Sequence, residues 1–177
     1  MFLAKGNVYN YTLIKEELYQ TSLKKFQSLK PFYEAIPKIL IRRIVNRQNR
    51  ITIGYTEEKL VFKKDINPFI PVNESFPAKY LLGIMASKLI SFLYVNISSI
   101  ATKDDFRQTT LTELRELLIP KSDKEIQQVI IDYVNKILIY KNQDPHFETS
   151  SIEAEIDQLV YKLYGLTDEE IRIVERS

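Results

Sequence analysis

The amino-acid sequence predicts an α+β fold, in which a small, mainly antiparallel sheet carries a packed helix and is followed by an antiparallel hairpin of two helices. Two observations lead to this fold class. Within residues 38–63, short runs rich in β-branched and aliphatic side chains alternate with polar positions, a period typical of strands. From residue 77 onward, apolar residues instead recur every three or four positions, the spacing of an amphipathic helix. A chain of 177 residues can bury a sizeable core.

The predicted sheet is built around a hairpin. Residues 38–45 form its first strand, because β-branched and aliphatic side chains suit a pleated, half-buried surface. Residues 51–55 form the second strand, where apolar residues alternate with Thr and Gly. Residues 59–63 are predicted to be a third strand, and residues 67–77, with three prolines, are predicted to be a loop. Ahead of the sheet, the apolar residues within 16–29 suggest a short helix.

The C-terminal half is predicted to be helical. A helix over residues 77–94 opens at a proline and turns its apolar side toward the core. The segment Ser122–Glu125 matches a capping box and starts a helix of about 20 residues. After a turn at 142–147, a second amphipathic helix ends at Gly165, and a capping box at 167–170 begins one more helical turn. Two apolar stripes joined by a short turn predict an antiparallel helical hairpin. The residues expected to be buried together there, or against a partner, are Ile126, Ile130, Tyr133, Ile137, Ile156, Leu159 and Leu163.

Composition excludes several classes of protein. The chain has no cysteine, which rules out disulfides and thiolate metal sites and is compatible with a reducing compartment. No basic stretch leading into an apolar core and cleavage site follows Met1, and no apolar run approaches membrane-spanning length. We therefore expect a cytoplasmic protein without a membrane partner.

The net charge of +2 hides an asymmetry between the two ends of the chain. Residues 1–64 contain 13 Lys and Arg against 5 Asp and Glu, whereas residues 65–177 contain 12 against 18. A basic first part and an acidic second part suggest one region that faces a polyanion and another that faces something else. We expect an α/β target-recognition domain at 1–120 and a helical hairpin tail at 121–177 that packs on it or on a partner.

The connector between the two hairpin strands is the strongest candidate for a ligand-binding segment. Residues 38–50 carry five basic side chains and no acidic one. Arginine, asparagine and glutamine can pair bidentately with guanine and adenine edges, although the same residue types also occur in ordinary solvated hairpin loops. A second polar segment, residues 98–110, could supply further contacts through Lys103, Arg107 and Gln108. The full set of predicted DNA contacts is Lys38, Arg42, Arg43, Asn46, Arg47, Gln48, Asn49, Arg50, Lys63, Lys103 and Arg107.

Several segments, in order and spacing, resemble the TaqI-like specificity domains of combined restriction and modification enzymes (type IIG), which are related to the domains of type I specificity subunits. These segments are PKILIRRI (37–44), KYLLGIMASKLISFLY (79–94), LLIPKSDKEIQQVIIDYVNKIL (117–138) and EIDQLVYKLYGLTDEEIRIVE (155–175). The resemblance extends over residues 2–175. The sequence departs from the family pattern at Ala86, where asparagine is common, and at Lys121-Ser122, where a second proline often follows Ile119-Pro120.

The resemblance implies a module that selects the sequence of double-stranded DNA while a separate region performs the chemistry. That region would be an adenine-N6 methyltransferase and endonuclease, in cis or as a separate subunit, with S-adenosylmethionine and Mg²⁺ as its cofactors. We expect no cofactor and no catalytic residue in this chain. Its four glycines are too dispersed for a nucleotide-binding loop, and it lacks the Asn-Pro-Pro-Tyr/Phe sequence of adenine methyltransferases.

Two other functions fit parts of the sequence. The segment Glu57-Glu58-Lys59 contains the Glu-x-Lys half of a metal-dependent nuclease site, but such a site needs another carboxylate, and the nearest acids outside it are Glu34 and Asp65. Alternatively, the helical hairpin docks a protein partner and the basic connector is incidental. The steep salt dependence of a phosphate-contacting protein would separate DNA binding from this second alternative.

Overall fold

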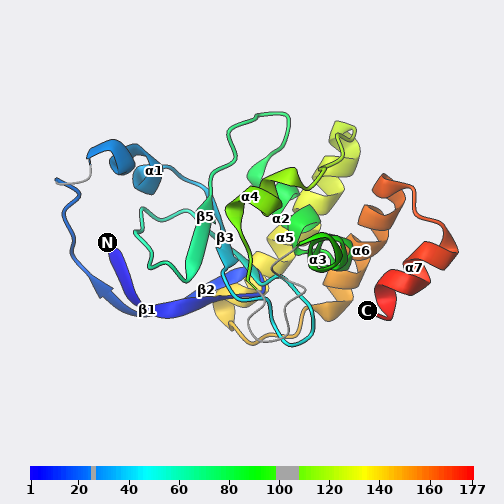
Figure 1. Ribbon diagram of the computed structural model, residues 1–177, viewed down its shortest axis with the longest axis horizontal. Helices are drawn as coiled ribbons and strands as arrows, with labels where there is room; N and C mark the ends of the chain where they lie inside the picture. Colours follow the sequence, from blue (N-terminus) through cyan, green and yellow to red (C-terminus); the bar gives the residue numbers. More distant parts are fainter. Residues whose placement is uncertain (25–26, 99–107) are drawn as a thin grey trace.

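The computed structural model describes residues 1–24, 27–98 and 108–177, and it has the α+β architecture predicted from the sequence. Strands gather toward one end of its long axis and most of the helices toward the other (Figure 1). The strands are β1 (Phe2–Tyr9), β2 (Thr12–Tyr19), β3 (Lys38–Arg42), β4 (Ile53–Thr56) and β5 (Ile66–Phe69). The helices are η1 (Gln27–Leu29), α1 (Lys30–Glu34), α2 (Ala78–Ala86), α3 (Lys88–Ile97), α4 (Leu111–Glu116), α5 (Lys124–Gln143), α6 (Ser150–Tyr164) and α7 (Asp168–Glu175).

The central strand is β3, which pairs antiparallel with β4 on one side and with β5 on the other. The predicted hairpin of the first two sheet strands is therefore confirmed. Successive residues of β3 face two different hydrophobic clusters. Ile39 and Ile41 join the large cluster formed with the helices, and Leu40 joins a smaller cluster formed with β1. All three are fully buried, because both faces of the strand are covered.

The N-terminal hairpin was not predicted. Strands β1 and β2 pair antiparallel around Tyr11, which has a positive φ of 63°, so the expected helix over residues 16–29 is wrong for its first part. The last five residues of β2 are all exposed, and their Glu-rich sequence carries no alternating pattern. Pairing with β1 across this tight hairpin outweighs the weak helical preference of these residues.

The third strand of the sheet also differs from the prediction. Residues 59–63 form only an isolated bridge, between Val61 and Phe2, and the strand that completes the sheet is β5, in a segment whose prolines predicted a loop. Pro68 is tolerated there because β5 lies at the edge of the sheet, where an amide donor on the outer side is not needed.

The single helix predicted over residues 77–94 is two helices, α2 and α3, whose axes differ by 66° across a break at Ser87. Ser87 is extended, and its side chain accepts a hydrogen bond from the Ile90 amide, which caps α3. Among the described residues no single helix is long and apolar enough to cross a membrane. Only α2 and α3 taken together, as a bent pair, have the length and apolar composition that a membrane span needs.

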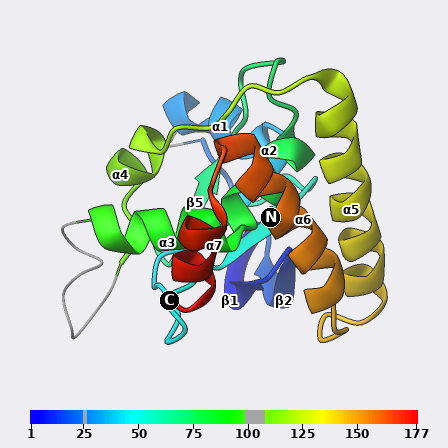
Figure 2. The same ribbon diagram turned by 90° about the vertical axis from the view of Figure 1, so that its right-hand side faces the viewer.

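Helices α5 and α6 form the predicted antiparallel hairpin, which packs on α2 (Figure 2). Helix α5 has the expected twenty residues, Gly165 ends α6 in the left-handed conformation, and Thr167 and Glu170 form the predicted capping box of α7. The N-cap of α5, however, is Asp123. The hydroxyl of Ser122 instead donates a hydrogen bond to the hydroxyl of Tyr80.

The predicted buried stripe of the helical hairpin is confirmed in its central part. Ile130, Ile137 and Ile156 are fully buried in the large cluster. Tyr133, Leu159 and Leu163 are half-buried at its edge. Ile126 is 37% exposed, because it lies toward the outer side of α5 at the start of the helix, so it is not buried with the others inside this chain, and its expected contact with a partner stays a prediction.

Candidate nucleic-acid interface

The basic connector is the loop between β3 and β4, which projects from the sheet toward the C-terminal end of α7 (Figure 2). It is ordered by its own hydrogen bonds. The side-chain oxygen of Asn46 accepts from the amides of Gln48 (2.9 Å) and Arg50 (2.8 Å), and the Asn46 amide donates to the Arg50 carbonyl at 3.0 Å. Asn49 adopts a φ of 58°, a left-handed conformation that asparagine tolerates in turns. Asn46 thus shapes the turn, which presents Arg47 and Gln48 at its exposed tip.

A second segment joins the base of this loop. The Thr109 amide donates to the Arg43 carbonyl at 2.7 Å, and the Arg43 side chain donates from Nε to Oε1 of Gln108 at 3.0 Å. The sequence predicts a further contact loop there. Lys103 and Arg107 lie outside the described residues, but Gln108, at the described end of this segment, lies beside Arg43.

Arg42 and Lys63 lie on the same side of the base of the loop. They line a pocket of about 190 Å³ together with Asn7 and Asp65, where the end of β3 meets the irregular part of β1. Lys63 is exposed and Arg42 is half-exposed. The structure therefore brings together cations that are 21 positions apart in the sequence, and Asp65 reduces their combined charge.

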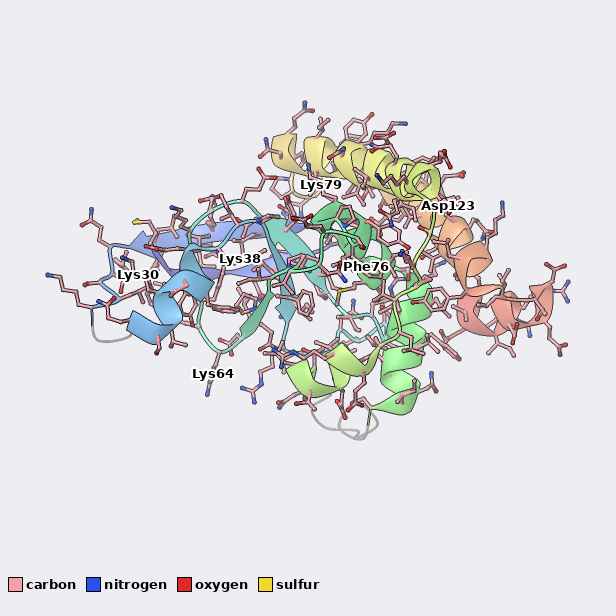
Figure 3. The ribbon with its side chains drawn as sticks, turned by 90° about the horizontal axis from the view of Figure 1, so that it is seen from above. Lys30, Lys38, Lys64, Phe76, Lys79 and Asp123 are labelled. Carbon is pink, nitrogen blue, oxygen red and sulfur yellow. The ribbon has the colours of Figure 1, made fainter. Side chains whose placement is uncertain are left out.

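Lys38 does not lie on this surface, which corrects its prediction as a DNA contact. Its side chain is fully buried, and its ammonium donates to the carbonyl oxygens of Tyr33 (2.9 Å), Ala35 and Glu58 (3.4 Å). Burial, helped by the charge of Lys59, lowers the pKa of Lys38. Figure 3 shows Lys38 among the strands, whereas Lys64 projects away from the protein. Lys38 ties β3 to the C-terminal end of α1 and to the segment after β4, and it cannot reach a phosphate from this position.

Arg50 also has a partner inside the protein. Its guanidinium donates from Nη2 to the carbonyl of Ala86 at 3.0 Å, and the next amide, of Ile51, donates to the hydroxyl of Ser91 at 3.2 Å. A pocket of about 170 Å³ separates the loop from α7, lined by Gln48, Asn49, Arg50, Lys88, Ser91, Phe92, Val174, Glu175 and Ser177. The sequence does not predict this support, because the residues that line the pocket are up to 129 positions apart and no local pattern joins them.

The Glu57–Lys59 segment does not form a metal site with the described residues. Glu57 accepts a hydrogen bond from the Tyr55 hydroxyl at 2.7 Å, and Glu58 is paired with Lys15. Nowhere in the described ranges do three or more His, Cys, Asp or Glu side chains converge in a way that could hold a metal ion. The two glutamates have structural partners instead.

Comparisons with known proteins agree on one family. The family model of the TaqI-like C-terminal specificity domain matches residues 2–119. A putative type II restriction enzyme and methyltransferase, RM.MjaORFECS2P of Methanocaldococcus jannaschii (strain ATCC 43067 / DSM 2661 / JAL-1 / JCM 10045 / NBRC 100440), is 42% identical over 172 residues. That match covers 90% of this chain and 14% of the relative, so the chain spans only a small part of its length.

A solved structure has a similar fold. It is the type IIL restriction-modification enzyme MmeI in complex with DNA, with a TM-score of 0.58 and 16% sequence identity over 78% of this chain and 20% of that chain. At this level of identity the likeness concerns the fold.

Proposed function

Because the chain belongs to the TaqI-like C-terminal specificity domain family, we propose that it is the module of a restriction-modification enzyme that recognises a specific sequence in double-stranded DNA. The observation that carries this proposal is the geometry of the loop between β3 and β4. A turn ordered by Asn46 presents Arg47 and Gln48 to solvent, with Arg42 and Arg43 at its base.

This arrangement suits the two parts of DNA recognition. Contacts to phosphates hold a protein in register on the duplex, and contacts to base edges in the groove select the sequence. Arginines at the base of a projecting loop are placed for the first task, and a guanidinium and an amide at its tip are placed for the second. Since the turn is ordered by its own hydrogen bonds, less conformational entropy is lost when it binds.

The finer part of the proposal concerns the rest of the enzyme. We assign methyl transfer and cleavage to an adenine-N6 methyltransferase and endonuclease region, in cis or as a separate subunit, as in a type IIG enzyme. S-adenosylmethionine and Mg²⁺ would be bound in that region, and the whole enzyme would act in the cytoplasm. The name of the relative from M. jannaschii, a restriction enzyme and methyltransferase, supports this division.

Selection of bound duplexes from a random library, with and without a methyltransferase partner, tests the proposal directly. We expect one enriched sequence, and an association constant that falls steeply and linearly with salt on logarithmic axes, because phosphate contacts release counterions. A library without enrichment, or binding that is insensitive to salt, would contradict the proposal.

A second candidate function is docking of a protein partner through the helical hairpin. One observation favours it: the outer side of α5 leaves Ile126 (37%), Val129 (45%) and Tyr140 (38%) exposed at helical spacing. Replacing Val129 by glutamate should abolish capture of such a partner and leave DNA binding unchanged. If the chain bound a partner but selected no DNA sequence, this second function would replace the first.

A further inference from the structure

The break between α2 and α3 leaves two backbone groups without partners within their own helices. Ala86 is the last residue of α2, so its carbonyl cannot accept an intrahelical hydrogen bond, and Lys88 is the first residue of α3, so its amide cannot donate one. The helix dipoles place partial negative charge at the first group and partial positive charge at the second. A cation suits Ala86, and an anion suits Lys88.

Two distant segments supply these partners. Arg50, from the loop between β3 and β4, donates to the Ala86 carbonyl at 3.0 Å. Asp157, from α6, accepts from the Lys88 amide at 2.8 Å and is buried, with 3% of its surface exposed. The loop and the helical tail are therefore attached to the same helix break, on either side of Ser87.

Helix α7 adds a second attachment at the same place. Glu175 accepts hydrogen bonds from the ammonium of Lys88 and from the hydroxyl of Tyr161, the latter at 2.9 Å. It also lines the pocket that Gln48, Asn49 and Arg50 line from the other side. The positive charge of Arg50 is thus close enough to Asp157 and Glu175 to interact electrostatically with both.

We propose that Arg50 and Asp157 are positioning residues. Through the helix break at Ser87 they hold the loop between β3 and β4 (residues 43–52) against α6 and α7, and this attachment is called the clamp below. This inference rests on the proposed function of the loop in DNA recognition. Arg50 belongs to the basic connector but serves the protein rather than the DNA. The orientation of Arg47 and Gln48, and with it the choice of bases, then depends on α6 and α7, more than 100 positions further along the chain.

Hydrogen exchange in the free protein tests the clamp without DNA. In Arg50→Ala, the amides of Gln48 and Ile51 should exchange faster by about tenfold, because the loop opens locally, while the melting temperature changes little. Arg50→Lys should restore part of the protection, since one donor and the charge remain. Asp157→Asn keeps an oxygen acceptor for the Lys88 amide but removes the charge, and it should loosen the same amides. Unchanged exchange in both Arg50→Ala and Asp157→Asn would overturn the clamp.

DNA binding separates positioning from contact. We would measure the selected duplex against a scrambled duplex of the same length. Arg50→Ala should reduce the preference for the selected duplex without changing the salt slope, whereas Arg47→Ala, the matched control, should alter DNA binding without altering loop exchange. A salt slope lower by about one unit in Arg50→Ala, with loop exchange unchanged, would show a phosphate contact and overturn the inference. If the wild-type protein bound no DNA, the proposed function would fail, and the exchange data would still decide whether the clamp exists.

Discussion

Gly83 in α2 lies so close to Ile130 in α5 that a Cβ at position 83 would be 2.6 Å from Cγ2 of Ile130 and 3.1 Å from Cγ2 of Val134. Only a residue without a side chain allows the two helices to approach this closely. This contact seats the helical tail on α2, and the tail residues Ile130 and Val134 are fully buried as a result. The tail and the sheet consequently share one large hydrophobic cluster, which also contains Ile39 of β3.

We therefore expect Gly83→Ala to destabilise the protein. Overpacking costs about 1–3 kcal/mol, and the higher helix propensity of alanine offsets about 1 kcal/mol, so a net loss of about 1 kcal/mol should appear in urea denaturation. The double variant Gly83→Ala/Ile130→Leu removes the branch that would collide, and it should lose less stability than the two single variants combined. A more stable Gly83→Ala would mean that α5 can move away without cost.

Lys38→Met should also destabilise the protein, for a different reason. The substitution keeps the length of the side chain but removes the donor to the carbonyls of Tyr33 and Glu58, which costs about 1–3 kcal/mol when the groups are buried. The exposed Lys30→Met is the matched control, and its effect should stay within about 0.5 kcal/mol. The salt slope of DNA binding should not change in Lys38→Met. A lower slope with unchanged stability would instead restore Lys38 as a phosphate contact.

Local signals in the sequence predicted the helical half well. The length of α5, the end of α6 at Gly165 and the capping box at Thr167 depend on residues within one or two turns, so they can be found without the tertiary structure. The break at Ser87 was missed because the apolar spacing continues through it into α3. What defines the break is a set of partners for its free backbone groups, and these come from distant segments.

The errors in the sheet and in the candidate site have the same origin. Strand β1 is defined by pairing with β2 and by the cluster around Leu40, and β5 is defined by pairing with β3 despite Pro68. Likewise, a lysine in a basic segment suggests a surface residue, and only the convergence of three carbonyls, from the C-terminal end of α1 and from the segment after β4, shows why Lys38 is buried. The two strand patterns predicted a loop at this position, which the pairing of β3 with β4 confirms, but the charge pattern could not separate residues that support the loop from residues exposed at its tip.

Attachment of α7 should depend on pH through Glu175. Partial burial alone would raise the pKa of this carboxyl group, but the hydrogen bonds from Lys88 and Tyr161 and the charges of Lys88 and Arg50 outweigh it, so the pKa lies below the ordinary value. A pKa that is lower in the folded state stabilises the protein above the unfolded pKa, and this contribution disappears as the pH falls through the folded pKa.

The stability difference between the wild-type protein and Glu175→Gln measures this contribution. The difference should be present at pH 7 and should decline once the pH falls below about 4.5, where the unfolded carboxyl group takes up its proton. Glu155→Gln, at an exposed position in the interior of α6 and away from the ends of that helix, is the control and should not reproduce the decline. A difference that stays constant between pH 7 and pH 3 would show that the ion pair with Lys88 does not hold the helix.

The last prediction concerns the tip of the loop, where Arg47 and Gln48 are exposed on the turn that Asn46 orders. We expect both to read bases, with Asn49 beside them, while Arg42 and Arg43 at the base contact phosphates. Replacing Arg47, Gln48 and Asn49 together by alanine should weaken binding to the selected duplex by about 1–3 kcal/mol for each base that is no longer read, and it should relax the preference at those positions. Arg42→Ala should instead weaken binding to all sequences alike and lower the salt slope by about one unit. Lys162→Ala removes one charge from the exposed side of α6 and controls for net charge. If the triple variant is folded and keeps both its affinity and its sequence preference, these three side chains contact neither bases nor phosphates. The loop is then only a solvated turn.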